Sequence, residues 1–467
     1  MRVHLIGICG TAMSALACML RASGHEVRGS DTSAYPPIGP MLKDRGIAIL
    51  DGYKAENVAW GPDTVVVGNV ARRDNPEAVA AQARGIPLIS MPQAIFRNFM
   101  QDRKSIVVTG THGKTTVTSM TAHILAHAGL DPSYLVGGIP LNFGSNYRLG
   151  KGPFFVIEGD EYDTAFFDKK AKFFHYNPSY AVMNALEYDH ADIYPDFAKL
   201  QASFEEFAAL VHADGHVAWC SHYPVLEKVV SHCRCPVTRY GLDVGDSGLR
   251  AANVAPGPSG TAFDVVRNGR KVASVLLPMW GNHNVLNALA AFGAAAWAGV
   301  PDDGIAAAMA EFQGVRRRFQ VIRQQDGVAV VDDFAHHPTA VRETLAAARL
   351  RYPQARVLAA FHFESNSSRR KVFEREYSRA FDSADYVFLT YPLKKKDDLK
   401  PEEYLDPAAV MNGIRKHASG VFAFEEMRSM AAHMAGMLRP GDVVVAMSGR
   451  DFSPFYDALF EMVEHRP

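Results

Sequence analysis

The sequence has little cysteine, no excess of charge of either sign and no long apolar run. Five cysteines occur among 467 residues, too few and odd in number for a disulfide framework, so we expect free thiols in the cytoplasm. Lys and Arg number 49 and Asp and Glu number 50, so no overall charge attracts nucleic acid or anionic lipid. The longest apolar run, from Ala288 to Val300, falls short of the roughly 18 to 20 residues that cross a membrane. We therefore expect neither nucleic-acid nor membrane partners.

Chain length and residue pattern predict an α/β protein of three domains. A chain of 467 residues is too long for one ordinary core at about 150 residues per domain. Starting near Arg2, Lys104 and Gly327, an apolar β-rich run ends in a turn and opens into helical spacing, which favours parallel sheets covered by helices. A Gly- and Pro-rich stretch from about 231 to 271 predicts extra strands in the middle domain. The expected domains are residues 1–100, 101–315 and 316–467.

The stretch GTHGKTT, residues 110–116, is close to the phosphate-binding loop of ATPases but is shorter. The usual spacing, G-x-x-x-x-G-K-[ST], needs a glycine five residues before Gly113, where this chain has Val108. Glycines let backbone N–H groups approach phosphate, and the following helix presents its positive end. Lys114 would then reach the β- and γ-phosphates and Thr115 would ligate Mg²⁺. The alternative is a turn that only caps a helix, but the preceding apolar strand favours nucleotide binding.

Two polar segments follow apolar runs in the middle of the chain. The segment EGDEYD includes Glu158 and Glu161, and the segment NALEYDH includes Asn184, Glu187 and His190. Ligands bind beyond the carboxyl ends of strands in α/β sheets, and carboxylate oxygens suit Mg²⁺. The alternatives are a solvated acidic loop and a structural histidine.

The first strand leads into LIGICGTAM, which resembles a dinucleotide fingerprint, with Asp31 after the next strand. The pattern G-x-G-x-x-G is broken because Cys9 replaces a glycine. As an NAD site it is weak, but as a cradle for a diphosphate at a helix N-terminus it remains reasonable.

The last third begins with consecutive arginines, Arg316, Arg317 and Arg318, and continues with the segment DDFAHHP. Arginine can neutralise a transferring phosphoryl group, although consecutive arginines at a domain border can also form a solvated hinge. In the segment GNHNVLN, Asn284 and Asn287 could hydrogen-bond adenine edges or merely cap a helix.

Taken together, GTHGKTT, the Glu158 segment, NALEYDH, GNHNVLNALAA, RRRF and DDFAHHPT resemble the Mur ligase family, the ATP-dependent amide-forming enzymes of peptidoglycan assembly. The resemblance spans almost the whole chain. It implies a Rossmann-like N-terminal domain for a UDP-sugar, a central P-loop ATPase domain with a parallel sheet and extra strands, and a C-terminal Rossmann-like domain that receives the amine.

Within the family, the segments GSDTSAYPP, EGDEYDTAFFDKKAKFFHY and ESNSSRRKVFE resemble the branch that joins UDP-N-acetylmuramate to the murein tripeptide L-alanyl-γ-D-glutamyl-meso-diaminopimelate. The alternative is the branch that adds L-alanine to UDP-N-acetylmuramate. In either branch, ATP activates the lactyl carboxylate as an acyl phosphate, which the amine then attacks.

The resemblance also implies roles for individual residues. ATP binding falls to Gly110, Thr111, His112, Gly113, Lys114, Thr115, Thr116, Asn284 and Asn287, and Mg²⁺ binding to Thr115, Glu158 and His190. Catalysis falls to Lys114, His190, Arg318, Asp333 and His336. For the UDP end we expect Gly7, Gly10, Thr11 and Asp31. For the peptide carboxylates we expect Ser367, Arg369 and Arg370, since Arg suits bidentate recognition; a solvated basic helix start is the alternative.

The chain also departs from the family pattern. Where several branches carry a carbamylated lysine for a second Mg²⁺, we find Glu205 and Glu206, and hypothesise that one of them, or no group, replaces it. Arg450 and Asp451 replace small neutral residues near the C-terminus, which leaves open which peptide is accepted. Two other classes remain: a nicotinamide oxidoreductase, which would leave GTHGKTT unexplained, and a P-loop ATPase without ligase activity.

Overall fold

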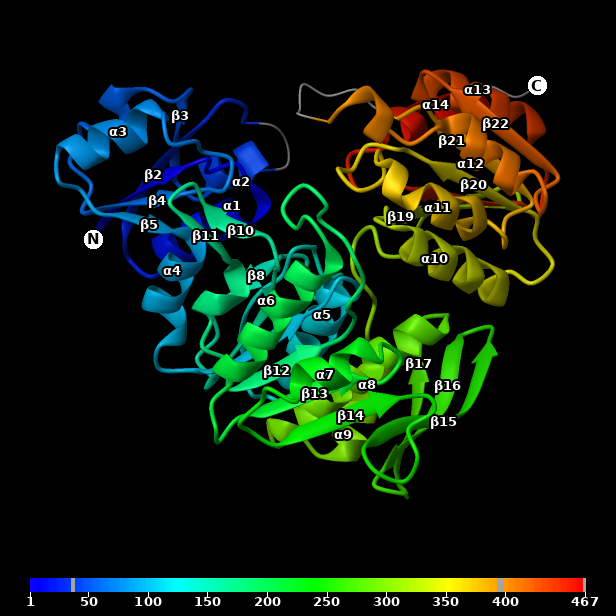
Figure 1. Ribbon diagram of the computed structural model, residues 1–467, viewed down its shortest axis with the longest axis horizontal. Helices are drawn as coiled ribbons and strands as arrows, with labels where there is room; N and C mark the ends of the chain where they lie inside the picture. The colour runs from blue at the N-terminus through cyan, green and yellow to red at the C-terminus, as the bar shows by residue number, and fades with distance from the viewer. Residues whose placement is uncertain (35–37, 393–398, 465–467) are drawn as a thin grey trace.

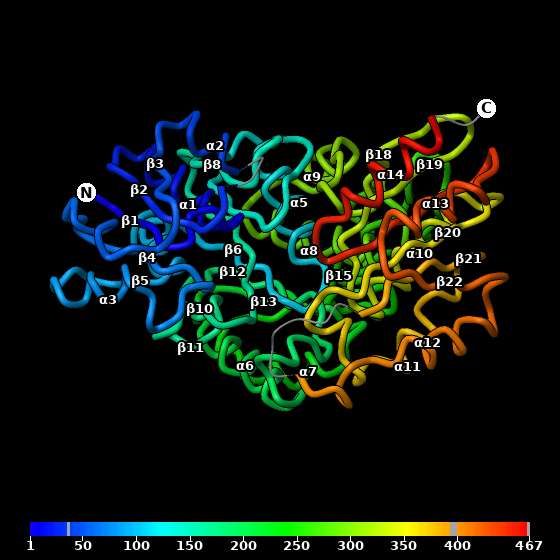
Figure 2. Tube along the Cα trace, turned by 90° about the horizontal axis from the view of Figure 1, so that it is seen from above, coloured from blue at the N-terminus to red at the C-terminus, as the bar shows by residue number. Residues whose placement is uncertain are grey.

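The chain forms three α/β lobes, each built around its own sheet (Figure 1). The computed structural model describes residues 1–34, 38–392 and 399–464. In the two views the N-terminal and C-terminal lobes lie on opposite sides, with the central lobe joining them (Figure 2). The predicted α/β architecture of three domains is confirmed.

The N-terminal lobe is a parallel sheet of five strands in the order β3-β2-β1-β4-β5. Its core forms because apolar strand residues such as Leu5 and Val66 pair in register and are fully buried. The reversal of strand order at β1 places the β1–α1 turn at the ligand-binding edge typical of Rossmann-like sheets. The strands are β1 (Arg2–Ile6), β2 (Glu26–Asp31), β3 (Ala48–Asp51), β4 (Thr64–Val67) and β5 (Leu88–Ser90), and the helices are α1 (Thr11–Ala22), α2 (Ile38–Asp44), α3 (Pro76–Ala83) and α4 (Met91–Ile95).

The central lobe contains a ten-stranded sheet in the order β17-β16-β15-β14-β13-β12-β6-β9-β7-β8. Strands β15 to β17 pair antiparallel and supply the extra strands predicted from the sequence. The strands are β6 (Lys104–Thr109), β7 (Ser133–Leu135), β8 (Tyr147–Arg148), β9 (Phe154–Gly159), β12 (Tyr180–Met183), β13 (His216–Cys220), β14 (Val237–Gly241), β15 (Leu249–Gly257), β16 (Gly260–Arg267) and β17 (Arg270–Leu277). A separate hairpin joins β10 (Asp163–Ala165) to β11 (Asp168–Ala171). The helices are α5 (Lys114–His127), α6 (Phe197–Leu210), α7 (Val225–Val230), α8 (Asn282–Trp297) and α9 (Asp302–Ala310).

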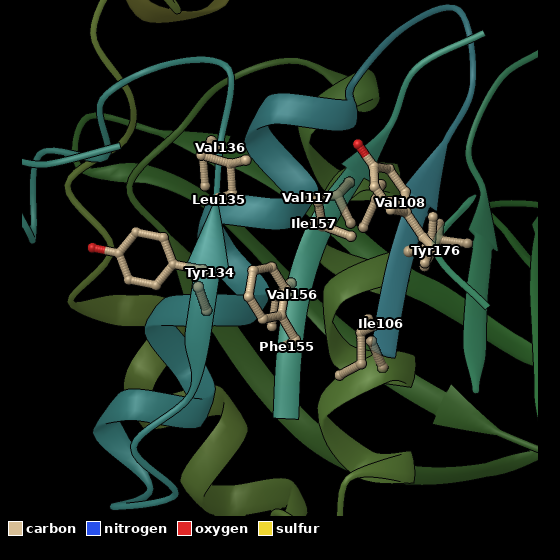
Figure 3. Close-up of a cluster of buried hydrophobic side chains, with 14 of the residues drawn as sticks. Ile106, Val108, Val117, Tyr134, Leu135, Val136, Phe155, Val156, Ile157 and Tyr176 are labelled. Carbon is tan, nitrogen blue, oxygen red and sulfur yellow. The ribbon is translucent and has the colours of Figure 1, made fainter. Parts of the chain in front are cut away.

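Three adjacent parallel strands at the centre of this sheet end at the same level. Thr109, the last residue of β6, pairs with Gly159 of β9 on one side and with Met183 of β12 on the other. The strands are held by apolar side chains such as Val108 and Val156, which are fully buried (Figure 3). The loops after β6, β9 and β12 therefore leave one edge of the sheet side by side.

The C-terminal lobe is a sheet of six strands in the order β18-β19-β23-β20-β21-β22, parallel except for β18. Its strands bury a separate apolar cluster on each face, one containing Phe361 and the other Phe388. The strands are β18 (Gln320–Gln325), β19 (Val328–Asp333), β20 (Val357–Phe361), β21 (Tyr386–Thr390), β22 (Gly420–Phe424) and β23 (Val443–Met447), and the helices are α10 (Pro338–Arg351), α11 (Glu374–Ala380), α12 (Pro407–Ile414), α13 (Met427–Met437) and α14 (Ser453–Glu464).

The segment that leads into the C-terminal lobe is bound to the central lobe by backbone hydrogen bonds. Pro140 and Val315 form an antiparallel bridge. The N–H of Leu141 donates to the carbonyl of Gly314 at 3.0 Å, and the N–H of Arg316 donates to the carbonyl of Ile139 at 2.9 Å. The chain thus stays anchored to the central lobe as far as Arg316.

Candidate active site

A cavity of about 1000 Å³ lies between the three lobes, and each lobe contributes to its wall. The N-terminal lobe supplies the β1–α1 turn, the central lobe supplies the loops after β6, β9 and β12, and the C-terminal lobe supplies the segment around Arg318. Most of the residues predicted for the site line this cavity, namely Gly7, Gly10, Thr11, Asp31, Thr111, His112, Gly113, Lys114, Thr115, Thr116, Glu158, His190, Asn284, Asn287, Arg318, Asp333 and His336.

The short glycine loop can form only with glycine at its two ends. Gly110 and Gly113 have φ of 132° and 82°, conformations that side chains rarely adopt. A Cβ at Gly113 would lie 2.1 Å from Asn184 Nδ2 and 2.3 Å from Asn287 Oδ1, and one at Gly110 would lie 2.7 Å from the nitrogen of Ala185. The loop is therefore packed directly on its neighbours and leads into α5 with its backbone exposed to the cavity.

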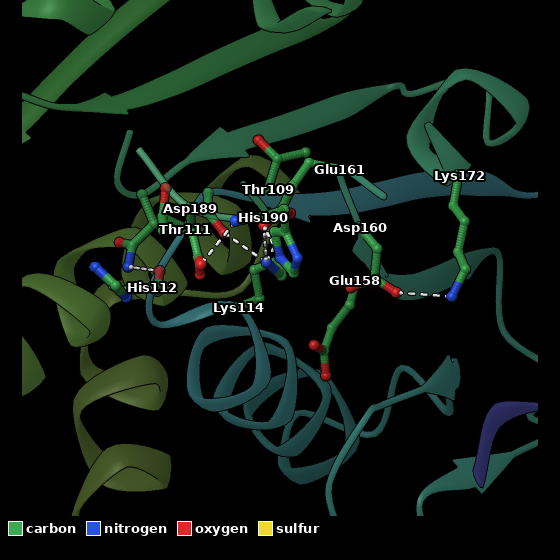
Figure 4. A network of polar contacts seen from close by, with 12 residues as sticks. Thr109, Thr111, His112, Lys114, Glu158, Asp160, Glu161, Lys172, Asp189 and His190 are labelled. Carbon is green, nitrogen blue, oxygen red and sulfur yellow. Dashed lines mark hydrogen bonds and ion pairs between the residues drawn. The ribbon is translucent and has the colours of Figure 1, made fainter. Parts of the chain in front are cut away.

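Lys114, at the start of α5, is held in a buried ionic triad (Figure 4). Its Nζ lies 2.8 Å and 3.1 Å from the two carboxylate oxygens of Glu161 and 2.7 Å from the carbonyl oxygen of Gly110. His190 Nε2 lies 3.2 Å from the same carboxylate. Sequence reasoning noted Glu161 only as one acid among several, because its link to both cations appears only once the strands are aligned.

The charges of this triad stabilise one another. Burial alone would raise the pKa of Glu161, but Lys114 and His190 lower it to about 2. Burial alone would lower the pKa of His190, yet the hydrogen bond and charge of Glu161 raise it to about 9. The pKa of Lys114 is likewise raised against burial by the carboxylates. All three groups are thus ionised near neutral pH, and Lys114 is fully charged at the mouth of the glycine loop.

Thr115 and Glu158 provide hard oxygen atoms next to this triad. Thr115 Oγ1 donates to Glu158 Oε2 at 3.1 Å, and the other carboxylate oxygen accepts from the N–H of Gly137 at 2.5 Å. Glu158 is only 9% exposed, and burial together with Asp160 raises its pKa. A carboxylate in this setting gains stability from a nearby cation, and a hydroxyl with a carboxylate is a donor set suited to Mg²⁺. The predicted magnesium residues Thr115 and Glu158 therefore fit the ion, while His190 is bound to Glu161.

The asparagines predicted for adenine form a buried network on the cavity floor. Asn184 Nδ2 donates to Asn287 Oδ1 at 2.8 Å, and Asn287 Nδ2 donates to Asn284 Oδ1 at 3.3 Å. Asn184 also donates to the carbonyl of His112 at 3.0 Å. This network ties the start of α8 to the glycine loop, so the two parts of the proposed ATP site are positioned by the same side chains. The role of Asn184 was not predicted.

Arg318 crosses from the C-terminal lobe into the central site. Its Nη2 donates to Thr115 Oγ1 at 3.2 Å, and its guanidinium lies 4.9 Å from the ring centre of Phe334. The residues on either side, Arg317 and Phe319, have φ of 57° and 52°, a strained backbone of a kind that clusters at functional sites.

Asp333 and His336 lie beside Arg318 on the same lobe. Asp333 accepts from the N–H groups of Phe319 at 2.6 Å and Ala335 at 2.7 Å, which fixes the turn that presents Arg318. Burial raises the pKa of Asp333 and lowers the pKa of His336. The predicted catalytic residues of the C-terminal lobe are therefore gathered at one point of the cavity wall.

The predicted UDP-sugar residues form a turn at the N-terminus of α1. The carboxylate of Asp31 accepts from the N–H groups of Cys9 and Thr32, each at 2.8 Å, so it fixes the turn. Gly10 precedes the 12-residue helix α1, and its first turn carries no acidic side chain. The positive end of the helix thus faces the cavity, as expected for a diphosphate cradle.

The peptide-binding candidates do not line the cavity. Ser367 Oγ hydrogen-bonds to Asp189. Arg369 is 1% exposed and lies 5.9 Å from the ring centre of Tyr404, and Arg370 forms a backbone bridge with the same tyrosine. In this arrangement the three residues hold their loop together, so their role in gripping peptide stays a prediction.

The carboxylates considered for a second Mg²⁺ also lie elsewhere. Glu205 accepts from Gln201 at 2.7 Å and pairs with Lys228 at 3.3 Å, and Glu206 lies 3.9 Å from Lys170. Neither lines the cavity, so the geometry gives the Glu205 and Glu206 hypothesis no support.

Three family models match consecutive parts of the chain. "Mur ligase family, catalytic domain" matches residues 2–103, "Mur ligase middle domain" matches 108–295, and "Mur ligase, glutamate ligase domain" matches 317–450. The chain belongs to the Mur ligase family. This Mur ligase is therefore an ATP-dependent ligase, and the predicted family is confirmed; the exact boundaries expected near residues 100 and 315 stay a prediction.

Relatives from two branches resemble this Mur ligase. The UDP-N-acetylmuramate–L-alanyl-γ-D-glutamyl-meso-2,6-diaminoheptandioate ligase of Escherichia coli K12 is 36% identical over 464 residues, covering 99% of this chain and 98% of that protein. The crystal structure of a murein peptide ligase from Psychrobacter arcticus 273-4 matches with a TM-score of 0.74 at 32% identity, covering 100% and 99%. A UDP-N-acetylmuramate–L-alanine ligase of Chlorobaculum tepidum is 36% identical over 97% of this chain and 93% of that protein.

Proposed function

We propose that this Mur ligase joins the lactyl carboxylate of UDP-N-acetylmuramate to the amine of L-alanyl-γ-D-glutamyl-meso-diaminopimelate, with ATP as the energy source, in peptidoglycan recycling in the cytoplasm. The observation that carries the choice is the nearly complete coverage by the Escherichia coli ligase named for that tripeptide, together with the Psychrobacter murein peptide ligase structure. No helix in the described part of the chain is long and apolar enough to cross a membrane.

The cavity supports a two-step reaction through an acyl phosphate. The N–H groups of the glycine loop and Lys114 hold the β- and γ-phosphates, while the turn at Gly10 holds the diphosphate of the sugar nucleotide. The lactyl carboxylate attacks the γ-phosphorus and ADP leaves. The amine of the peptide then attacks the acyl carbon, which forms the amide and releases phosphate.

Catalysis here consists mainly of positioning and charge neutralisation. Arg318 reaches Thr115 across the lobe boundary, where it can stabilise negative charge on the transferring group, since arginine presents several donors in a fixed plane. Mg²⁺ held by Thr115 and Glu158, with His190 as a further candidate, would neutralise phosphate charge. Asp333 keeps the turn before Arg318 in place.

A second candidate is ligation of L-alanine, favoured by the Chlorobaculum tepidum relative of equal identity. The test is release of ADP and formation of amide from UDP-N-acetylmuramate, ATP and Mg²⁺, with either L-alanine or the tripeptide as the amine. We expect kcat/KM to be higher for the tripeptide. A higher kcat/KM for L-alanine would reject the tripeptide proposal in favour of the second candidate, and no sugar-dependent ADP release would reject both.

A further inference from the structure

Two imidazoles and a carboxylate meet where the ATP loop touches the C-terminal lobe. They belong to His112 of the loop, Glu187 after β12 and His337 before α10, and one ligand atom of each lies within 4.8 Å of the others. His112 Nε2 is 2.7 Å from Glu187 Oε2, and the rings of His112 and His337 are 4.8 Å apart between centroids. None of the three belongs to the oxygen-rich set suited to Mg²⁺.

The chemistry of this donor set points to a different metal. Two imidazole nitrogens and one carboxylate oxygen are ligands typical of Zn²⁺, whereas Mg²⁺ prefers oxygen alone. With bonds of about 2.0–2.1 Å, tetrahedral Zn²⁺ ligands lie roughly 3.3 Å apart. The cluster therefore needs side-chain movements of roughly 1.5 Å in total, and the fourth position is left for a water molecule.

Neighbouring groups orient two of the three donors. Glu187 Oε1 accepts from Thr339 Oγ1 at 3.2 Å, and the ring of His337 lies 3.2 Å from the carbonyl of Tyr188 and 3.3 Å from the N–H of Thr339. A bound cation would replace one contact of that ring and leave the other, which is the outer-shell arrangement found at metal-binding histidines.

The protonation states suit a metal site. Burial, reinforced by the charge of His112, lowers the pKa of His337 to about 4. Burial alone would raise the pKa of Glu187, but its hydrogen bond with His112 and the nearby imidazoles lower it to about 2. At neutral pH His337 is therefore neutral and Glu187 is ionised, the forms that bind metal.

We propose that His112, Glu187 and His337 form a site for a borderline divalent cation such as Zn²⁺, separate from the Mg²⁺ of the ATP site. The first two ligands belong to the central lobe and the third to the C-terminal lobe. The cation therefore ties the ATP loop to the C-terminal lobe.

The test is Zn²⁺ binding to the full chain, measured by isothermal titration calorimetry in millimolar Mg²⁺ without ATP, sugar or peptide. We expect one tight site per chain. Glu187→Gln and His337→Gln should each weaken it by at least the 10- to 100-fold typical of losing an outer-shell partner. His212→Gln, which removes an exposed histidine 3.9 Å from Asp214, is the matched control and should bind as the unaltered chain does.

Two further measurements guard against misfolded variants and against the thiols of Cys233 and Cys235. The visible spectrum of the unaltered chain loaded with Co²⁺ should show tetrahedral coordination with nitrogen ligands. Binding that is lost in Cys233→Ser/Cys235→Ser but kept in Glu187→Gln and His337→Gln would assign the ion to the thiols and overturn the proposal, as would a spectrum of oxygen ligands alone. Because no substrate is present, failure here leaves the proposed ligase activity untouched.

Discussion

Replacing Glu161 by glutamine should destabilise the central lobe, because it leaves the ammonium of Lys114 without its main partner. The two side chains are 13% and 2% exposed, so the pair is buried and the small energies of surface salt bridges do not apply. Removing one member of a buried pair costs about 3 to 5 kcal/mol. We take the lower end, about 3 kcal/mol, because Lys114 keeps its bond to the carbonyl of Gly110. For a lobe of this size that lowers Tm by roughly 6 to 12 °C.

The assay is differential scanning calorimetry of the full chain without nucleotide. The central transition is recognised by its upward shift when ADP and Mg²⁺ are added, since a ligand of the folded state raises Tm. Lys114→Met should cost less than Glu161→Gln because His190 still pairs with Glu161. The double variant should be more stable than Glu161→Gln alone, since no unpaired ammonium remains buried.

The coupling between the two positions decides the matter. Residues in contact typically show interaction energies of about 0.5 to 3 kcal/mol, whereas independent sites add to within about 0.5 kcal/mol. If the double variant loses as much stability as the two single variants together, the ionic triad is not what holds Lys114, and the reasoning fails.

Three further outcomes can be measured on the same protein. Arg318→Lys should lower kcat by about 10²- to 10³-fold with little change in the KM for ATP, measured by ADP release; an unchanged kcat would remove Arg318 from the reaction. Gly113→Ala should abolish ATP binding in calorimetry because its Cβ would meet Asn184 at 2.1 Å, whereas Gly436→Ala, inside α13 with nothing within 4 Å, should bind ATP normally. The pKa of His190 is raised to about 9, so its contribution to stability is complete below about pH 6.5 and is lost as pH rises through 9; His190→Gln should flatten the fall of Tm over that range, and an identical fall would exclude it.

The fold and the principal site residues could be predicted because both follow from local patterns. A strand, a glycine turn and a helix are written next to one another around Lys114, and adjacent parallel strands bring their carboxyl ends to one edge. Glu158 and His190 therefore meet Lys114 once β6, β9 and β12 stand in register.

The remaining contacts depend on how the lobes and helices pack, which spacing along the chain does not encode. Glu161 was one acid among several until its position between Lys114 and His190 was known. The meeting of His112 with His337 joins segments more than two hundred residues apart. The opposite error concerned Glu205, whose sequence position suggested a ligand but whose helix directs it to Lys228.

The backbone bonds between residues 139–141 and 314–316 limit how an engineer could reshape substrate choice. Grafting the final third of a related enzyme onto this chain should keep the native text through Arg316, because a junction placed earlier would cut the small β-like seam that seats the graft. The two left-handed residues beyond it, Arg317 and Phe319, then become the pivot about which any transplanted lobe must swing.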